Sequence, residues 1–322
     1  MAISNLPNYT LPASQFLSSI TTFVNQLRFK DTLKATSMVR DFVDNCKVGK
    51  VDSGKGIVFT FKKSLQPVNN LSTTSSVLTI TPPAVAQEII AIDTYKVIPL
   101  SVSRQLMYDA VPEGALVDTF LNYLYSLMED TQKFFEFDEL VYTLFNWTPT
   151  QATQTIQINQ LDTSGLTGAD LQGAVQWNAS EIARVVRKTI NNLGYKSTAY
   201  TDVATTLTAL DKGDLRLIMN DTYETEFLAN AMASLYHSDK VGEMISGLTK
   251  DVLPEDIFNT YNEQNTIGFL FDVDKLAMAD YYKLQMSFTD ASTLFTNSFL
   301  HFAYGKGIFL NAVGIKFVKN VI

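Results

Sequence analysis

The segment between residues 116 and 146 constrains the fold more than any other part of the chain. Its apolar side chains recur at steps of three and four residues, which is the spacing of one face of an α-helix. They are Leu116, Phe120, Leu124, Leu127, Met128, Phe134, Phe135, Leu140, Leu144 and Phe145. At 1.5 Å per residue, about thirty residues give a helix on the order of 45 Å long. We expect this helix to be the longest in the chain, to end before Pro149, and to pack its apolar stripe against predicted strands near 93–102 and 298–318.

A predicted hairpin with almost no apolar residues at its tip follows the first fifty residues. The Gly/Lys-rich stretch at 47–56 leads into an alternating strand with Ile57, Phe59 and Phe61, and a second strand is expected at 77–80, before Pro82–Pro83. The polar sequence NNLSTTSS lies between them. Two strands with so little apolar surface are not stable alone. We therefore expect residues 51–83 to project from the body and to contact a neighbouring subunit.

The remaining patterns indicate a mixed chain of helices and strands. Residues 1–30 are interpreted as an arm with limited structure of its own. A second helix is expected to begin at Asn178, with Glu181 in the position of a capping box, and to end at Gly194. Further strands are expected at 93–102, 215–219, 267–273 and over the last 40 residues, with a helix opened by Asp221 and Glu224, and the run 241–263 is expected to be mostly connection. This order predicts an α+β fold.

Composition and charge limit the classes of function. The net charge is −8 and the pI is near 4.9, whereas a protein that grips nucleic acid usually carries a basic field. The single cysteine, Cys46, permits no intrachain disulfide and fits a reducing compartment. The N-terminal residues lack the pattern of a secretory signal, and no apolar run approaches the roughly 18 residues of a membrane span. We expect a soluble protein made in a cytoplasm.

Few residues suit catalysis or metal binding. His237 and His301 have no Cys/His partner at ligand spacing, and Cys46 is interpreted as a small buried residue. The stretch from Gly49 to Gly56 has the spacing of a phosphate-binding loop, but it ends in glycine where Ser or Thr would bind magnesium. It also leads into a strand instead of a helix N-terminus. The sequence therefore predicts no enzyme, no cofactor and no metal site.

The order of elements resembles the Hong Kong 97-type capsid fold of tailed bacteriophages. The sequence DLRLIMNDTYETEFLANAMASLYHSDKVG (214–242) is similar to the axial A-domain segment of these proteins, and GFLFDVD (268–274) to its strand and acidic turn. SFLHFAYGKGIFLNAVGIKFV (298–318) is similar to the closing strands, and the nearest likeness is to the major capsid proteins of phi29-type podophages. The resemblance implies an N-terminal arm (1–46), an E-loop hairpin (47–90), a P domain (91–195) with a spine helix (116–146), an A domain (196–290), and closing strands of the P domain (291–322).

The same resemblance implies a function. It implies a structural major capsid (head) protein that assembles into hexamers and pentamers of an icosahedral or prolate phage shell enclosing the DNA genome. Its partners would be further copies of itself, scaffolding and portal proteins, and non-specifically packaged DNA, with no membrane. The protein would be made in the host bacterial cytoplasm and end in the virion. An encapsulin-like compartment shell has the same fold and stays open as an alternative, as does a tail or collar component.

The distribution of charge suggests how neighbouring subunits adhere. The hairpin region carries several lysines against one acid, Asp52, and the long helix carries several acids against one base, Lys133. If the hairpin of one subunit lies across the helix of the next, these charges attract each other. Alternatively, both surfaces are merely solvated, since exposed pairs contribute only ~0–1 kcal/mol each. The residues expected in this intersubunit contact are Lys47, Lys50, Lys55, Lys62, Lys63, Glu129, Asp130, Glu136, Asp138 and Glu139.

Overall fold

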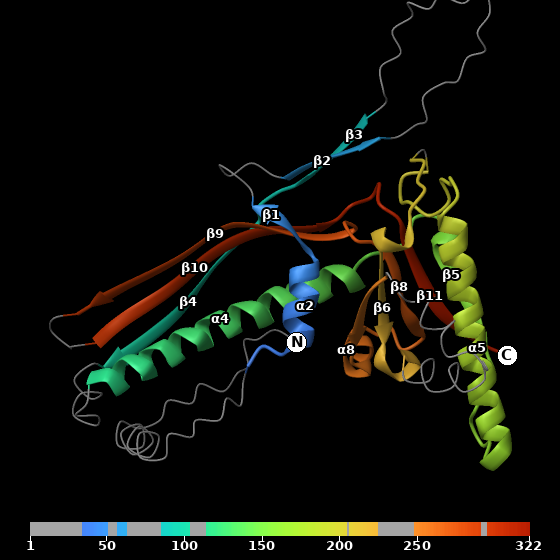
Figure 1. Ribbon diagram of the computed structural model, residues 1–322, viewed down its shortest axis with the longest axis horizontal. Helices are drawn as coiled ribbons and strands as arrows, with labels where there is room; N and C mark the ends of the chain where they lie inside the picture. The colour runs from blue at the N-terminus through green and yellow to red at the C-terminus, as the bar shows by residue number, and fades with distance from the viewer. Residues whose placement is uncertain are drawn as a thin grey trace, which may run out of the picture. The chain divides into compact units, whose positions relative to one another are not determined.

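A computed structural model describes residues 34–50, 57–62, 85–103, 114–204, 206–224, 248–290 and 295–322. These residues form two compact units, each built from segments that are distant in the sequence. The first unit comprises the described parts of 1–56, 91–142 and 278–306, and the second those of 57–90, 143–277 and 307–322. Both units combine helices and strands (Figure 1), so the predicted α+β class is confirmed.

A four-stranded sheet forms the framework of the first unit. Its strand order is β1 (Lys47–Lys50), β9 (Leu276–Thr289), β10 (Phe295–Ile308) and β4 (Thr94–Ser103). β10 and β4 are antiparallel over ten residue pairs, from Phe295↔Ser103 to Tyr304↔Thr94, whereas β1 runs parallel to β9. The strand expected at 93–102 is therefore correct to within one residue at each end.

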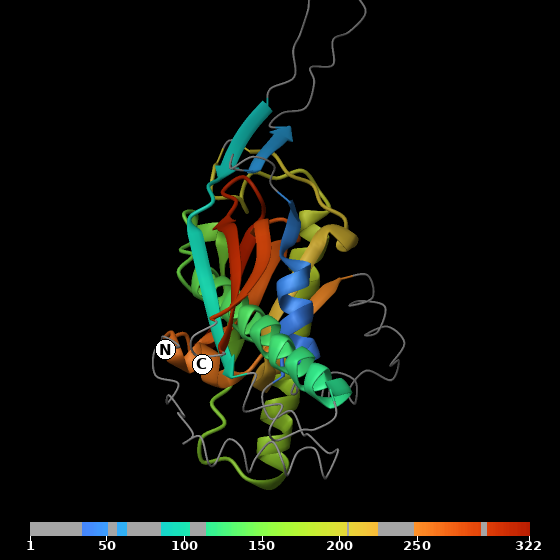
Figure 2. The same cartoon turned by 90° about the vertical axis from the view of Figure 1, so that its left-hand side faces the viewer.

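The helix α4 (Gly114–Phe145) confirms the prediction made from the apolar spacing. Its 32 residues make it the longest helix in the described part of the chain. In Figures 1 and 2 it lies along the sheet formed by β4, β9 and β10. The ring of Phe135 packs edge-on against Phe302 of β10 at 6.1 Å, and Lys96 of β4 lies 5.4 Å from its centroid. The apolar stripe thus meets the predicted strands within this unit. The side chains of Phe120 and Leu124 lie outside the described ones.

A short helix that the sequence patterns did not predict, α2 (Ser37–Asn45), packs on α4. Thr36 caps its N-terminus, because the Thr36 hydroxyl accepts a hydrogen bond from the backbone of Val39. Phe42 of α2 contacts Phe137 of α4 edge-on, with 5.3 Å between the ring centroids. Cys46 follows α2 and is 1% exposed, as expected of a small buried residue.

A five-stranded sheet forms the framework of the second unit. Its order is β5 (Thr155–Gln160), β11 (Gly314–Val321), β8 (Thr266–Asp272), β6 (Leu215–Asn220) and β7 (Thr249–Leu253). β8 is antiparallel to both of its neighbours, and the two outer pairs are parallel. Gly268 permits the close approach of β8 and β6, because a Cβ atom there would lie 2.5 Å from the carbonyl oxygen of Ile218.

Helices cover both faces of this second sheet. α5 (Gly168–Leu193) contributes Ile182, Val186, Ile190 and Leu193 to a hydrophobic core of this unit. On the other face, Phe145 at the end of α4 stacks on Tyr261, which follows α8 (Glu255–Thr260), at 4.8 Å. Short 3-10 helices occupy Ala152–Gln154 and Lys212–Asp214.

The predicted hairpin is present, but with a different return strand. β2 (Ile57–Lys62) pairs antiparallel with β3 (Val85–Ile90), from Ile57↔Ile90 to Lys62↔Val85. The return strand therefore follows Pro82–Pro83, and the strand expected at 77–80 lies outside the described residues.

Two further expectations need correction, and one strand was missed. Asn178 does not begin a helix: α5 starts ten residues earlier, and the Asn178 side chain is buried, bonding the backbone of Leu161. The run 241–263 is not mostly connection, since it contains β7 and α8. β5 was not predicted. Of the helix that was expected to open at Asp221, the structure describes residues 221–224, which are helical. The rest of that segment, with His237, lies outside the described residues.

The two units also divide the chain differently from the expected domain boundaries. The second unit joins β6 and β8 with β5 and α5, which were expected in 91–195, and with β11, which was expected in 291–322. β9, which was expected in 196–290, instead pairs with β10. Strand pairing between distant segments decides this division, and the order of elements along the chain does not reveal it.

Candidate functional site

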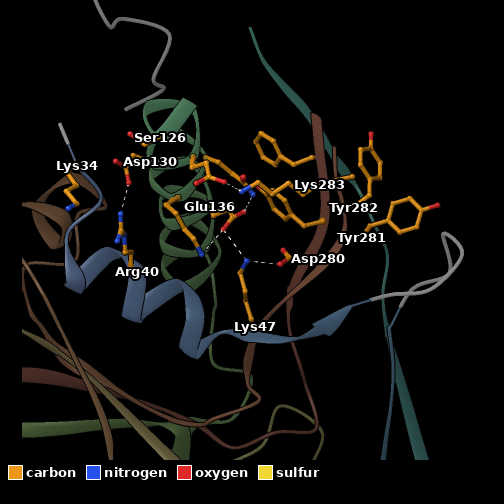
Figure 3. Close-up of a pocket in the computed structure, with 16 residues that line it drawn as sticks. Lys34, Arg40, Lys47, Ser126, Asp130, Glu136, Asp280, Tyr281, Tyr282 and Lys283 are labelled. Atoms are coloured by element: carbon orange, nitrogen blue, oxygen red, sulfur yellow. Dashed lines mark hydrogen bonds and ion pairs between the residues drawn. The ribbon is translucent and has the colours of Figure 1, made fainter. Parts of the chain in front are cut away.

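A cavity of about 700 Å³ in the first unit gathers many of the charged residues singled out in the sequence. Side chains from α2, β1, α4, β9 and β10 line it (Figure 3). The charged residues in its lining are Lys34, Arg40, Lys47, Glu129, Asp130, Lys133, Glu136, Asp280 and Lys283. Positive and negative groups are thus nearly balanced within it.

Lys47 occupies the centre of this charged cluster. Its ammonium lies 2.7 Å from the carboxylate of Asp280 and 3.6 Å from that of Glu136. Burial alone would lower the pKa of Lys47, but the carboxylates of Glu136 and Asp280 outweigh this effect and raise the pKa above its usual value. Lys47 therefore stays charged and links β1 to both α4 and β9.

Four of the five helix acids named above bind a base of the same chain. Asp130 pairs with Arg40 at 2.9 Å and Glu129 with Lys283 at 2.8 Å. Glu139 pairs with Lys306, and Glu136 lies near Lys47 and Lys133. Asp138 is exposed. The sequence showed only one base near these acids, Lys133 on the same helix. The other bases come from segments that are distant along the chain.

Glu136 does not fit the expectation of a surface contact. Its side chain is 0% exposed, and one of its oxygens accepts a hydrogen bond from Gln132 at 2.5 Å. The other oxygen has no hydrogen bond within the described residues and lies 3.6 and 3.8 Å from two ammonium groups. These distances lie within the range of ion pairs but are too long for direct hydrogen bonds. Asp130 is also buried, so both acids hold the chain's own segments together.

The predicted lysines of the hairpin are described only in part. Lys50 ends β1 and Lys62 ends β2, and only their backbone is described. Lys55 and Lys63 lie outside the described residues, as does most of the stretch Gly49–Gly56 that was considered as a phosphate-binding loop.

Alternate residues near the end of β9 form an exposed apolar stripe. Tyr282, Leu284, Met286 and Phe288 are 38%, 51%, 55% and 57% exposed, and residues at this spacing share one face of a strand. Phe288 stacks on Phe299 of β10 at 5.8 Å. Past the segment paired with β1, no described strand covers the outer edge of β9. Exposed apolar strand edges are typical sites of association with another chain.

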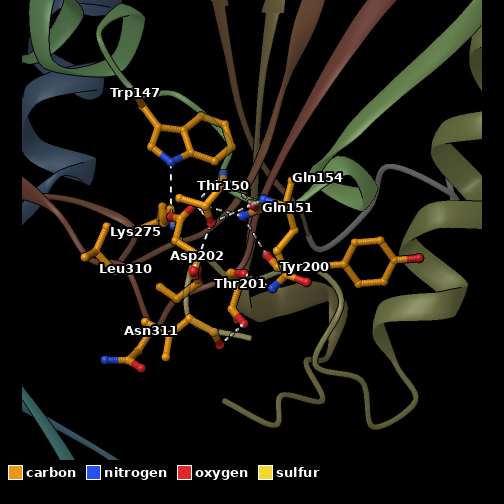
Figure 4. A network of polar contacts seen from close by, with 12 residues as sticks. Trp147, Thr150, Gln151, Gln154, Tyr200, Thr201, Asp202, Lys275, Leu310 and Asn311 are labelled. Atoms are coloured by element: carbon orange, nitrogen blue, oxygen red, sulfur yellow. Dashed lines mark hydrogen bonds and ion pairs between the residues drawn. The ribbon is translucent and has the colours of Figure 1, made fainter. Parts of the chain in front are cut away.

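A buried ion pair stabilises the loops of the second unit (Figure 4). The ammonium of Lys275 lies 2.5 Å from the carboxylate of Asp202, and their side chains are 0% and 1% exposed. Asp202 also accepts hydrogen bonds from Trp147 and Gln154, each at 3.1 Å. Gly314 makes room for this arrangement, since a Cβ atom there would lie 2.8 Å from Lys275 and 2.9 Å from Trp147.

This network fixes the turn between β10 and β11. Lys275 donates to the carbonyl of Ala312 at 3.0 Å, and the backbone N–H of Asp202 donates to the carbonyl of Leu310 at 3.0 Å. Asn311 is 4% exposed and accepts a hydrogen bond from the Thr206 hydroxyl at 2.6 Å. Burial raises the pKa that Asp202 would have alone, but the ammonium of Lys275 holds it below the usual value.

The described residues offer little for chemistry on a substrate. They contain no group of three or more His, Cys, Asp or Glu arranged to hold a metal ion. His301 is half-buried beside Phe299, and the pair of Lys275 and Asp202 is closed to solvent. No helix in the described part of the chain combines the length and apolarity of a membrane span.

Comparison with known proteins assigns these features to a class. A family model described as Phi29-like phage major capsid protein matches residues 57–317. No curated protein sequence matches the chain.

Several solved phage structures have the same fold. The capsid structure of Staphylococcus phage Andhra is similar, with a TM-score of 0.63, 12% identity, and coverage of 91% of this chain and 88% of that one. A chain in the structure of head fiber and inner core protein gp22 of native bacteriophage P68 has a TM-score of 0.60 and 12% identity, and the match covers 90% of this chain and 88% of that one. The head structure of Helicobacter pylori bacteriophage KHP40 has a TM-score of 0.55 and 11% identity, and the match covers 99% of this chain and 97% of that one. The predicted Hong Kong 97-type fold is thereby confirmed.

Proposed function

The chain belongs to the Phi29-like phage major capsid protein family, and from this premise we propose how its surfaces build a shell. It is a structural protein of the phage head and a component of the virion. The observation that carries this conclusion is the family match over residues 57–317, which runs from the hairpin to the last strand. We propose that copies assemble as hexamers and pentamers, because self-complementary surfaces of one chain lead to closed symmetric assemblies.

The β2–β3 hairpin is the proposed contact with a neighbouring copy. Among the described residues these two strands pair only with each other, and an isolated two-stranded ribbon is marginally stable in water. Packing on another subunit would supply the missing apolar contacts. In this proposal the hairpin is the E-loop, and the described residues of 1–46 end the N-terminal arm. The rest of the first unit is the P domain, with α4 as its spine helix, and the rest of the second unit is the A domain.

The charged contact between neighbours remains part of the proposal in a narrower form. Lys50, Lys55, Lys62 and Lys63 of one copy would meet the exposed acids of α4 in the next, which are Glu129 and Asp138, together with the partly exposed Glu139. Glu129 has 63% of its side chain exposed and Glu139 has 29%. Lys47, Asp130 and Glu136 are assigned to the subunit's own ion pairs.

The remaining partners follow from the same premise. We propose that the chain has no catalytic role and needs no cofactor. It would assemble with scaffolding and portal proteins in the host bacterial cytoplasm, apart from any membrane, and would enclose DNA without gripping it. A net charge of −8 supports loose enclosure, since tight binding of DNA requires basic surfaces.

Electron microscopy of the purified chain, expressed alone and together with its scaffolding partner, tests this function. We expect closed shells or their hexameric and pentameric pieces. Rings or tubes would instead indicate a tail or collar component, and shells filled with a cargo enzyme would indicate an encapsulin-like compartment.

Deletion of residues 66–76 tests the role of the hairpin. The shortened chain should stay folded, because the deleted residues lie beyond the paired strands, but it should fail to form shells. Sedimentation measures the fraction of the chain that assembles, and circular dichroism of the unassembled chain shows whether it is folded. Normal shells from the shortened chain would contradict the hairpin contact.

A further inference from the structure

Glu88 links the hairpin to the turn between β10 and β11 in the second unit. One oxygen of its carboxylate accepts a hydrogen bond from the backbone N–H of Leu310 at 2.8 Å, and the other from that of Asn311 at 3.3 Å. Two successive backbone N–H groups form a small anion-binding concavity. Here the anion is a side chain of the hairpin itself, and hydrogen bonds to a charged acceptor are stronger than neutral ones.

The turn that receives Glu88 is held rigidly from behind. Leu310 accepts a hydrogen bond from the backbone of Asp202, and the side chain of Asn311 is buried against Thr206. Ala312 accepts a hydrogen bond from the buried ammonium of Lys275. The acceptor site for Glu88 is thus an extension of the buried ion-pair network, and its position is fixed by several independent contacts.

Among the hairpin side chains that the structure describes, Ile90 makes a second contact with the rest of the second unit. Ile90 is 6% exposed and packs beside Gly307, but its neighbour Ile89 is 66% exposed. Glu88 of β3 pairs with Phe59 of β2, and β2 continues for three more residues, to Lys62. At about 3.3 Å per residue, Lys62 lies on the order of 10 Å farther along the strand. A change of angle at Glu88 is therefore amplified toward the far end of the hairpin.

We propose that Glu88 is the positioning residue that sets the direction of the β2–β3 hairpin, through its two hydrogen bonds to the backbone of Leu310 and Asn311. The role rests on the proposed contact between the hairpin and a neighbouring copy. By holding the hairpin in one direction before assembly, Glu88 reduces the conformational entropy lost when the contact forms.

Distance measurements between two spin labels in the unassembled full-length chain test this role. The labels are attached to cysteines at Lys62 and at Tyr195, which is 70% exposed, in a Cys46→Ala background. We expect one narrow distance distribution with Glu88 present and at least a twofold broader one in Glu88→Ala. Glu88→Gln should give an intermediate width, because its amide oxygen still accepts a hydrogen bond. The backbone amides of Leu310 and Asn311 should exchange their hydrogens faster in Glu88→Ala.

Matched variants separate this role from a general loss of stability. Glu181→Ala removes a partly buried carboxylate that pairs with the exposed Arg184 on α5, away from the hairpin, and should leave the distribution unchanged. Glu88→Asp keeps the charge but is one methylene shorter, so it should also broaden the distribution, and it carries the test if Glu88→Ala does not fold. An equally narrow distribution in Glu88→Ala and Glu88→Asp would overturn the proposal. If the chain without residues 66–76 forms normal shells, the neighbour contact is wrong, and the label distances still decide the role of Glu88.

Discussion

Lys275 and Asp202 carry full charges in a place where a single charge would be strongly unfavourable. Lys275→Met leaves the Asp202 carboxylate buried without its counter-ion, and breaking a buried pair in this way costs about 3–5 kcal/mol. The measurement is the free energy of unfolding of the unassembled chain in urea. Lys188→Met, at an exposed position of α5, should change it by no more than about 0.5 kcal/mol. Adding Asp202→Leu to Lys275→Met should recover part of the loss, and no recovery would argue against the uncompensated charge as its cause.

Asp272 gives the second unit a dependence on pH. Burial, together with the nearby carboxylates of Asp274 and Asp214, raises its pKa from 3.8 to about 6, against the opposing hydrogen bond from the backbone of Asp274. The folded state thus binds this proton more tightly than the unfolded state does. The resulting stability is present below pH 4 and is lost as the pH rises through 6.

Asp272→Asn should therefore stabilise the chain at neutral pH. The amide carries no charge to bury and keeps an oxygen that can accept the hydrogen bond from Asp274. We expect a gain of about 1–3 kcal/mol at pH 7.5 and little change at pH 4, measured by urea unfolding at both values. A gain of the same size at both pH values would show that the effect does not come from titration of Asp272.

At the scale of elements, the long helix α4 is stabilised mainly by the residues that face inward. Leu140 is 0% exposed, whereas Tyr142, two residues later, is 55% exposed. Leu140→Ala should lower the free energy of unfolding by roughly 2–5 kcal/mol, as removal of a buried leucine does. Tyr142→Ala is the control and should have an effect below about 0.5 kcal/mol. Comparable losses from both variants would show that the apolar spacing does not define the buried face.

Elements with a strong apolar period could be predicted from the sequence, and elements with a weak one could not. α4 and the strands β4, β6, β8 and β10 carry dense apolar patterns, and their predicted bounds are close to the observed ones. β5 has the sequence TIQINQ, which contains only two apolar residues, and its pairing partner β11 lies 161 residues away. Asn178 had the sequence of a helix cap, but its side chain instead bonds the loop after β5. Tertiary contacts overrode the local signal in both cases.

The candidate contact residues illustrate the same limit. The acids of α4 could be found from the sequence, but their partners could not, because Arg40 and Asp130 are 90 residues apart and Lys283 and Glu129 are 154 apart. Glu136 had the sequence of a surface acid, and its burial follows from the way α2 and β1 pack on α4. Glu88 gave no signal at all, since its role depends on backbone groups of a distant turn.

At the scale of the whole molecule, each copy of the chain must keep its buried ion pairs while offering exposed charges to its neighbours, and Glu129 is one of these although it also pairs with Lys283. The pairs around Lys47 are partly buried, so salt weakens them less than it weakens exposed charges. The proposed contact between hairpin lysines and the exposed acids of α4 is strongly weakened when the Debye length falls to about 3 Å at 1 M salt. Assembly should therefore slow as salt rises, at concentrations where the free chain remains folded.

Charge reversal provides the sharper form of this prediction. Lys62→Glu with Lys63→Glu should block assembly, because the hairpin would then repel Glu129 and Asp138 of the next copy. Changing these two acids to lysine in the same chain should restore assembly in part, as light scattering during assembly would measure. Arg187→Glu with Lys188→Glu makes the same change in net charge at exposed positions of α5 and serves as the control. Assembly that is indifferent to both salt and charge reversal would contradict this contact. The exposed apolar stripe of β9, which includes Leu284, Met286 and Phe288, would then be the main source of adhesion between copies. In that case Leu284→Ser with Met286→Ser should abolish shells, while the charge variants assemble normally.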